Sequence, residues 1–306
     1  MTYVGADGRR LLREDQIVPQ AFLDLGSGGY IMATHNLGYS HYNALQVQFQ
    51  RQLSSGLQAL VSYNLSKASD LGSSDASGVA AASISQVVLP SLTPADFDIR
   101  NTFSGAVSYD IPAPSGGGMG AAILKGWAVD ALLRVTSTPP INVIVSVVSP
   151  QTGYYQTQAE IVPGQLYWIP DPTQPNGRAL NPGAFTTPAA GMTGNFPRNG
   201  LRSGYSIDQT DLALRRRFNL TERVRLDIRA EYFNIFNHPM FGAPGSEYAP
   251  YTYWGYGPQP AQGFGQVTPG YTTNVAMGGG GANGGQNPLY SVGGPRSGQL
   301  TLKITF

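Results

Sequence analysis

The sequence predicts an all-β fold, in which one antiparallel, up-and-down sheet of about seven to eight long strands carries long loops at one end. Three observations predict this fold. Apolar and polar residues alternate in long runs, and very long connections alternate with short ones. Charged residues make up only 12% of the chain, while Gly (39) and Pro (23) are plentiful. Such a composition is rich in turns and poor in solvated helix faces.

The C-terminal stretch shows the alternation most clearly. From Gln299 to Phe306 every second residue is apolar, and the chain stops on an aromatic residue. A period of two predicts a strand with one polar and one apolar face. Chain ends usually fray unless they are docked, so we expect this strand to be paired. Its apolar face must contact either a protein core or lipid.

The first clear hairpin joins two alternating runs, residues 42–53 and 57–66. Ser54-Ser55-Gly56 separates them. We expect a three-residue hairpin loop with Gly56 in the left-handed conformation. That pairing places Phe49 opposite Val61 on the apolar face.

Four further runs predict long strands at 98–111, 126–138, 207–218 and 224–236, with 141–148 as an apolar extension of the second. The connections are short near residues 54, 112 and 219, and very long from 68, 149 and 237. Loops beyond about 15 residues are uncommon in compact domains. Long loops at one end and short turns at the other are typical of transmembrane β-barrels, whose strands are apolar outward and polar inward.

In a transmembrane barrel the polar face lines a lumen and the apolar face meets lipid. The residues expected to face the lumen are Arg100, Asp130, Arg134, Asp211, Arg215, Arg217, Arg225, Asp227, Arg229, Glu231 and Lys303. The residues expected to face lipid are Leu45, Val47, Phe49, Phe103, Leu133, Leu212, Leu214, Leu226, Ile228, Leu302 and Phe306. Aromatic residues near strand ends, Trp127 and Phe218 among them, would lie at the membrane interfaces. Arg216 breaks the apolar row near a turn, where its long side chain can reach headgroups.

The charged row has two interpretations. Its side chains either pair across strands and solvate the lumen, or contact a substrate or plug. The pattern allows Arg215 to face Asp227, or Asp211 to face Arg229, for turns of five or three residues respectively.

An aromatic run near residue 250 is the candidate for ligand capture. Tyr251, Tyr253, Trp254 and Tyr256, with Tyr248 before them, offer rings on which amphipathic ligands such as sugars can stack. Tyr and Trp also seat loops at membrane surfaces, so both interpretations remain open.

Composition and motifs exclude several other functions. The net charge is only +1, which gives no basic field for nucleic acid. The chain has no cysteine, and its three histidines have no ligand spacing. No hydrolase or phosphate-loop motif occurs. We therefore expect no catalytic residue, no cofactor and no metal site.

The chain resembles the C-terminal part of the TonB-dependent, Oar-like outer-membrane transporters, a family that often carries a carboxypeptidase-regulatory-like domain. The stretches that carry the resemblance occur in the family's order, with long variable loops between them. They are Gly38–Gln46, Ser62–Lys67, Asp98–Asn101, Asn181–Phe185, Arg198–Arg202, Arg229–Pro239 and Phe306.

The resemblance implies an outer-membrane location, a signal peptide, an N-terminal plug and a barrel of about 22 strands. It also implies outer-membrane lipid, the plug, further barrel strands, TonB (through the plug) and the barrel-assembly machinery (through the C-terminal strand) as partners. We expect a fragment, with residues 1–39 as an irregular internal loop bearing one short strand near 21–25. Residues 40–306 are then the C-terminal barrel part, as an open curved sheet or a small barrel closed by the N-terminal residues.

Two rivals remain. A soluble secreted all-β binding or adhesion module would pack the same alternating strands as two sheets, with Val47 and Leu226 in a dry core. An enzyme hidden in the long loops is the second, although no motif supports it.

Overall fold

A computed structural model of the chain describes residues 1–18, 31–73, 80–84, 91–112, 125–149, 153–189, 192–238, 244, 248, 264–267 and 296–306. These residues form strands and irregular chain, together with two 3-10 helices, η1 (Pro175–Gly177) and η2 (Pro182–Ala184). In the described part of the chain, no helix has the length and apolar character needed to cross a membrane.

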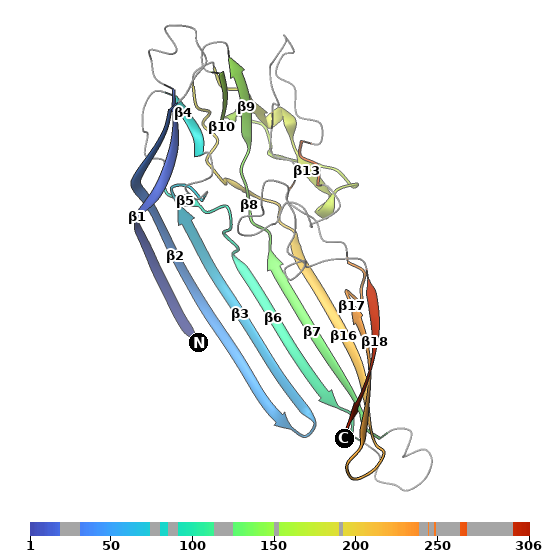
Figure 1. The fold of residues 1–306 in the computed structure, drawn as a ribbon. Helices are drawn as coiled ribbons and strands as arrows, with labels where there is room; N and C mark the ends of the chain where they lie inside the picture. The colour runs from blue at the N-terminus through green and yellow to red at the C-terminus, as the bar shows by residue number, and fades with distance from the viewer. Residues whose placement is uncertain are drawn as a thin grey trace.

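One large sheet dominates the structure (Figure 1). Its long strands are β1 (Thr2–Val18), β2 (Ile31–Ser54), β3 (Leu57–Asp70), β6 (Asn101–Asp110), β7 (Trp127–Ser137), β16 (Ser206–Asn219), β17 (Arg225–Phe233) and β18 (Ser297–Thr305). They lie in the order β18-β17-β16-β7-β6-β3-β2-β1, and each neighbouring pair is antiparallel. The predicted all-β, up-and-down fold is confirmed.

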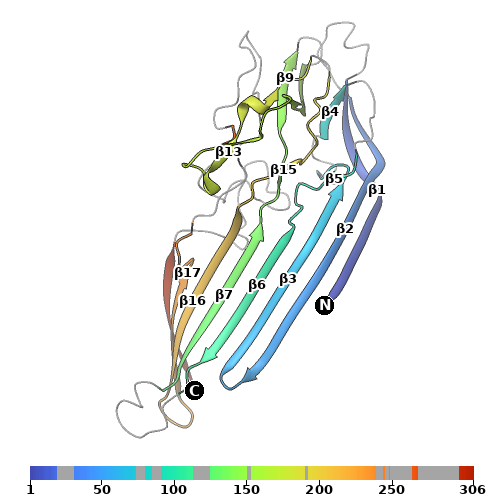
Figure 2. The same cartoon turned by 180° about the vertical axis from the view of Figure 1, so that it is seen from behind.

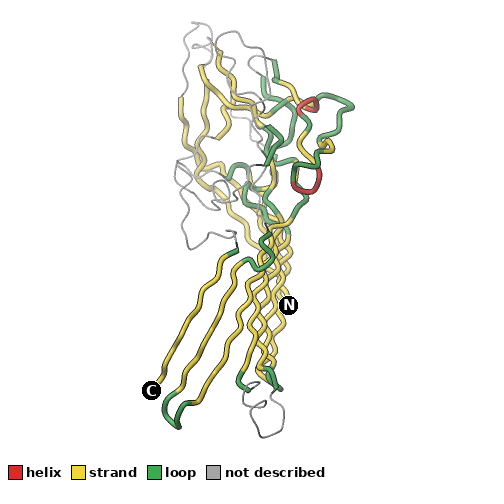
Figure 3. Tube along the Cα trace, turned by 90° about the vertical axis from the view of Figure 1, so that its right-hand side faces the viewer, coloured by secondary structure: helices red, strands yellow, loops and turns green. Residues whose placement is uncertain are grey.

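The sheet is open. β18 forms one edge, and β4 (Ala80–Ile84) pairs with β1 at the other, as the single parallel pair among the described strands. β5 (Thr93–Pro94) pairs with the end of β3. Seen from the side, the C-terminal strands stand away from the N-terminal ones, so the sheet curves without closing (Figure 3).

The prediction of irregular chain over residues 1–39 is wrong. Thr2–Val18 form β1, and β2 already begins at Ile31. The pairing of β1 with β2 shifts register on both sides of Leu11. Such irregularities move side chains to the opposite face and hide the period of two. The short strand expected near 21–25 lies outside the described residues.

The hairpin of β2 and β3 keeps the expected register in its middle, where Phe49 faces Val61. Its loop, however, has two residues and not three, because Ser54 faces Leu57 and the register shifts after Arg51. Both loop residues, Ser55 (φ 52) and Gly56 (φ 79), are left-handed. Two-residue loops of this kind match the twist of paired strands.

The register divides the sheet into two faces. Register places the apolar residues of neighbouring strands side by side, with Val47 next to Tyr63 and Tyr63 next to Phe103. Phe49 is 60% exposed and Leu302 is 64% exposed. The described residues therefore form no second layer over this face, in contrast to the sandwich that the soluble rival requires.

A compact module covers the long-loop end of the sheet (Figures 1 and 2). We call it the cap and define it as residues 138–205 with Tyr248 and Phe264. Its strands are β8 (Pro140–Ile141), β9 (Ile144–Ser149), β10 (Gly153–Gln158), β11 (Glu160–Ile161), β12 (Trp168–Pro170), β13 (Arg178–Leu180), β14 (Phe185–Thr186) and β15 (Leu201–Arg202). They pair as β8-β15, β9-β10, β11-β14 and β12-β13. The stretch predicted as one long loop is thus largely folded.

Candidate functional site

A charged strip runs along the polar face of the sheet near its C-terminal edge. Asp130, Arg215, Arg217, Asp227 and Arg229 line a shallow hollow there. These residues come from β7, β16 and β17, and the regular alternation of each strand turns them to the same face. Three arginines face two aspartates, so the hollow suits an anionic or mixed-charge contact.

Asp130 is the centre of this strip. Its carboxylate lies 3.3 Å from Arg215 Nε and 3.4 Å from Arg229 Nη1. Arg215 and Arg229 face each other across β16 and β17. Asp130 thereby screens two like charges that would otherwise repel each other.

Both pairings suggested by the sequence are wrong. Asn219 faces Arg225 across residues 220–224, so Arg217 faces Asp227, and Arg217 Nε donates to Asp227 Oδ1 at 2.8 Å. Arg215 Nη2 instead donates to Asp110 Oδ1 at 2.9 Å. β16 runs to Asn219 and β17 begins at Arg225, each one residue later than the sequence predicts, so the partner of Asp227 is Arg217 and not Arg215.

Most of the other predicted lumen-facing residues share this face. The register groups Arg134, Asp211, Arg225, Glu231 and Lys303 with the strip. Arg229 Nε donates to Glu231 Oε1 at 2.8 Å. Arg100 does not belong to this row of side chains. It lies just before β6, and its Nε is 3.0 Å from Asp98. The predicted lipid-facing residues of β2, β6, β7, β16, β17 and β18 share the opposite face.

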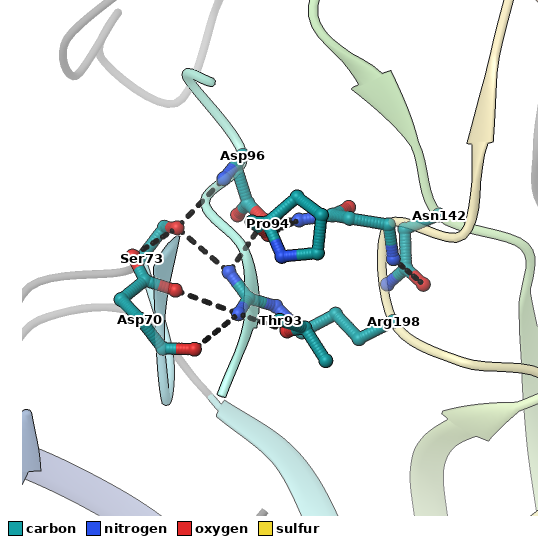
Figure 4. Close-up of polar contacts among 8 residues, drawn as sticks. Asp70, Ser73, Thr93, Pro94, Asp96, Asn142 and Arg198 are labelled. Atoms are coloured by element: carbon teal, nitrogen blue, oxygen red, sulfur yellow. Dashed lines mark hydrogen bonds and ion pairs between the residues drawn. The ribbon is translucent and has the colours of Figure 1, made fainter. Parts of the chain in front are cut away.

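Arg198 fastens the cap to the sheet (Figure 4). Its Nη1 donates to Asp70 Oδ1 at 2.7 Å and to Thr93 Oγ1 at 3.1 Å. Its Nη2 donates to Ser73 Oγ and to Asp96 Oδ1, both at 2.7 Å. One guanidinium therefore ties the cap to the end of β3 and to the segment after β4 through charge-assisted hydrogen bonds.

Asp98 makes a second fastening. Its side chain is fully buried, accepts a hydrogen bond from the Ala68 N–H at 2.7 Å and pairs with Arg100 and Arg202. Arg202 belongs to β15 of the cap, and its Nη1 also donates to the Asp98 carbonyl at 2.9 Å. Burial lowers the pKa of the Arg202 guanidinium from its ordinary value, while Asp98 opposes this shift.

The cap has its own aromatic core. Phe185 stacks on Tyr167 with ring centres 5.6 Å apart, and meets Phe196 edge-on at 5.4 Å. Tyr248 meets Phe264 edge-on, also at 5.4 Å. Tyr248 is only 8% exposed, which corrects the expectation that it offers a ring to a ligand. Tyr251, Tyr253, Trp254 and Tyr256 lie outside the described residues.

The alternating pattern of the sequence predicts no role for Arg198, Arg202 or Asp98. The signal was nevertheless present, because Asp98–Asn101 and Arg198–Arg202 are two of the stretches that carry the family resemblance. In the structure these two stretches meet at Arg202 and Asp98. In the described part of the chain, no group of three or more His, Asp or Glu side chains is placed to hold a metal ion.

Comparison with known proteins identifies one family. Residues 1–276 match the model of the outer membrane beta barrel domain. A search of curated proteins found no match, and neither did a search of solved structures.

Proposed function

Because the chain belongs to the outer membrane beta barrel domain family, we propose that it forms part of the wall of a TonB-dependent, Oar-like transporter. The protein is located in the outer membrane and associates with its bilayer. In the proposed role the sheet is non-catalytic: its charged face lines a wet lumen, and its cap and outer loops meet the ligand.

The observation that carries the proposal is the division of the sheet into two faces. The charged strip lies on one face, and the exposed apolar residues, including Phe49 and Leu302, lie on the other. A sheet in hydrocarbon needs an outward apolar face, and a water-filled barrel needs an inward polar one. Both requirements are met along strands of transmembrane length.

The sheet edges support the proposal that further strands complete the wall. Among the described strands, β18 and the β1-β4 pair form the two edges of the sheet and leave backbone groups unpaired there. Such groups are not tolerated in hydrocarbon, where each costs several kcal/mol. We place the remaining barrel strands against these edges, a plug against the charged strip, and the barrel-assembly machinery at β18 and Phe306 during insertion.

Cysteine labelling tests the orientation, because the chain has no cysteine of its own. Gln48→Cys and Thr301→Cys on the polar face should react with a hydrophilic maleimide in intact outer membranes. Their neighbours Val47→Cys and Leu302→Cys should be protected from it. A spin-labelled acyl chain should quench fluorophores attached at Val47→Cys and Leu302→Cys, but not those at Gln48→Cys and Thr301→Cys. Equal labelling at both pairs would refute the orientation.

Crosslinking tests the transporter role. The periplasmic domain of TonB, added to outer membranes that contain the intact protein, should crosslink to it more strongly when its transported ligand or a ligand-bearing extract is present. A crosslink yield no greater than that of an unrelated porin would count against TonB dependence and leave the barrel assignment standing.

A further inference from the structure

A cationic and aromatic group lies on the apolar face at the end with the short turns. Arg216 of β16 has its guanidinium carbon 5.0 Å from the ring centre of Trp127 and 4.3 Å from that of Phe218. Arg216 faces Trp127 of β7 on one side and Ile228 of β17 on the other. The cation is therefore held between rings on an otherwise apolar surface.

A second cation lies at the same corner. Gly126 accepts a hydrogen bond from the Arg217 N–H at 2.9 Å, and Lys125, which is exposed, precedes it. A hollow beside these residues is lined by Gly126, Trp127 and Arg216, together with polar-face residues that include Asp110 and Asp227. We call Lys125, Trp127, Arg216 and Phe218 the basic-aromatic cluster.

Charged residues lie on the apolar face in both halves of the sheet. Near the short turns, the charged residues that the strand register places on this face are Arg51 and Arg216, both cationic. In the half nearer the cap this face carries the acids Asp7 and Asp208 and also the cations Arg9 and Lys67, so charges of both signs lie there.

The acids nearest the cluster lie on the polar face or in the turn. Asp110 and Asp227 belong to the polar face, where they pair with Arg215 and Arg217 at 2.9 Å and 2.8 Å. Glu222 is exposed in the turn between β16 and β17. At the short-turn end, the charged residues that the register places on the apolar face are therefore cationic.

We propose that the basic-aromatic cluster binds the phosphate group of a phospholipid in the leaflet at the short-turn end. The inference rests on the proposed orientation of the apolar face toward lipid. A guanidinium presents a planar fork of N–H donors that matches phosphate, and the flanking rings fix its plane. Tryptophan favours the headgroup level of a membrane, which places Trp127 at the same depth as the phosphate.

Lipid binding to the intact protein tests the proposal. The protein is purified from outer membranes in mild detergent, titrated with phosphatidylglycerol, and its bound lipid is counted by native mass spectrometry. Arg216→Gln should weaken binding at the tightest site about tenfold, and Arg216→Lys by less, since lysine keeps the charge but not the fork. Lys125→Gln removes one positive charge at an exposed position and should weaken it about threefold.

The matched control is Arg225→Gln, which removes the same charge near the same turn but from the polar face. It should bind phosphatidylglycerol like the unaltered protein. Unchanged binding in both Arg216→Gln and Lys125→Gln would overturn the proposal, as would equal weakening by Arg225→Gln.

Two further readouts separate the possible failures. Inorganic phosphate at the same concentration should not displace the lipid; if it does so as well as phosphatidylglycerol itself, the site recognises free phosphate and the lipid assignment is wrong. If Val47→Cys is labelled from water, the orientation in the proposed function has failed. If Val47→Cys is protected and Arg216→Gln binds normally, only the lipid site has failed.

Discussion

Arg198 Nη1 lies 2.7 Å from Asp70 Oδ1, although the two residues are 128 positions apart. The Asp70 side chain is only 7% exposed and that of Arg198 17% exposed, so the pair is largely shielded from solvent. Ser73 Oγ donates to Asp70 Oδ2 at 2.6 Å and accepts from Arg198, which closes the network. The contact joins the cap to the end of β3 and fixes where the cap stands over the sheet.

Arg198→Gln should release the cap without unfolding the sheet. Removing one partner of a shielded ion pair leaves the other uncompensated, at a cost of about 3 kcal/mol. Hydrogen exchange should rise in residues 153–189 and stay unchanged in β6 and β7. Arg223→Gln, which changes an exposed arginine in the turn at the opposite end, is the control and should alter neither region. Equal exchange in the cap of both variants would contradict the assigned role.

Asp98→Asn should be more damaging than Asp96→Asn. Asp98 is fully buried between Arg100 and Arg202. Neutralising it leaves both cations without their carboxylate partner and should lower the free energy of unfolding by about 3–5 kcal/mol. The Asp96 side chain is 58% exposed. Asp96→Asn should therefore lower the free energy of unfolding by about 1 kcal/mol or less. The yield of folded, heat-modifiable protein in outer membranes measures the difference. Similar yields for the two variants would argue against a structural role for the Asp98 pair.

The sequence predicted those parts of the fold whose information is local. Phe49 faces Val61 as expected, because alternation with a period of two fixes a face over a few residues. β1 was missed because register shifts around Leu11 break the period. The pairing of Arg217 with Asp227 depends on where the strands end at the turn, which alternation does not determine. The cap core gathers Phe185, Tyr248 and other residues from distant, aperiodic stretches, so no local pattern marks it.

Asp130→Asn should destabilise the charged strip in a salt-dependent way. Without the carboxylate, Arg215 and Arg229 face each other directly, at a cost of about 1 kcal/mol at low salt. Added salt screens this repulsion. The thermal unfolding midpoint of purified Asp130→Asn should therefore be lower than that of the unaltered protein at low ionic strength. The difference should become smaller at high ionic strength. Asp227→Asn, which removes the partner of Arg217 alone, should show the smaller effect; the reverse order would place the centre of the strip elsewhere.

Alkaline pH should loosen the cap through Tyr248. Burial raises the pKa of its phenol above the ordinary value, so the folded cap favours the neutral form. The stability that this group contributes is complete below about pH 10 and is lost as pH rises through the raised pKa. Protease sensitivity of the cap should therefore increase at high pH, and less so in Tyr248→Phe. Tyr109→Phe, at a half-exposed position of β6, should leave the profile unchanged.

Gly56→Ala should destabilise the β2-β3 hairpin, whereas Gly72→Ala should not. Gly56 has φ 79, and a Cβ there would lie 2.6 Å from the Asp110 carbonyl oxygen, so the backbone of β6 must move. We expect Gly56→Ala to lower the free energy of unfolding by about 1–2 kcal/mol. A Cβ on Gly72 meets nothing within 4 Å, which makes it the matched control. Ser55→Asn should add about 0.5 kcal/mol, because asparagine accepts the left-handed conformation that Ser55 (φ 52) already adopts. Urea unfolding of the detergent-solubilised protein measures all three. A Gly56→Ala variant as stable as Gly72→Ala would show that the hairpin turn has another geometry in the membrane.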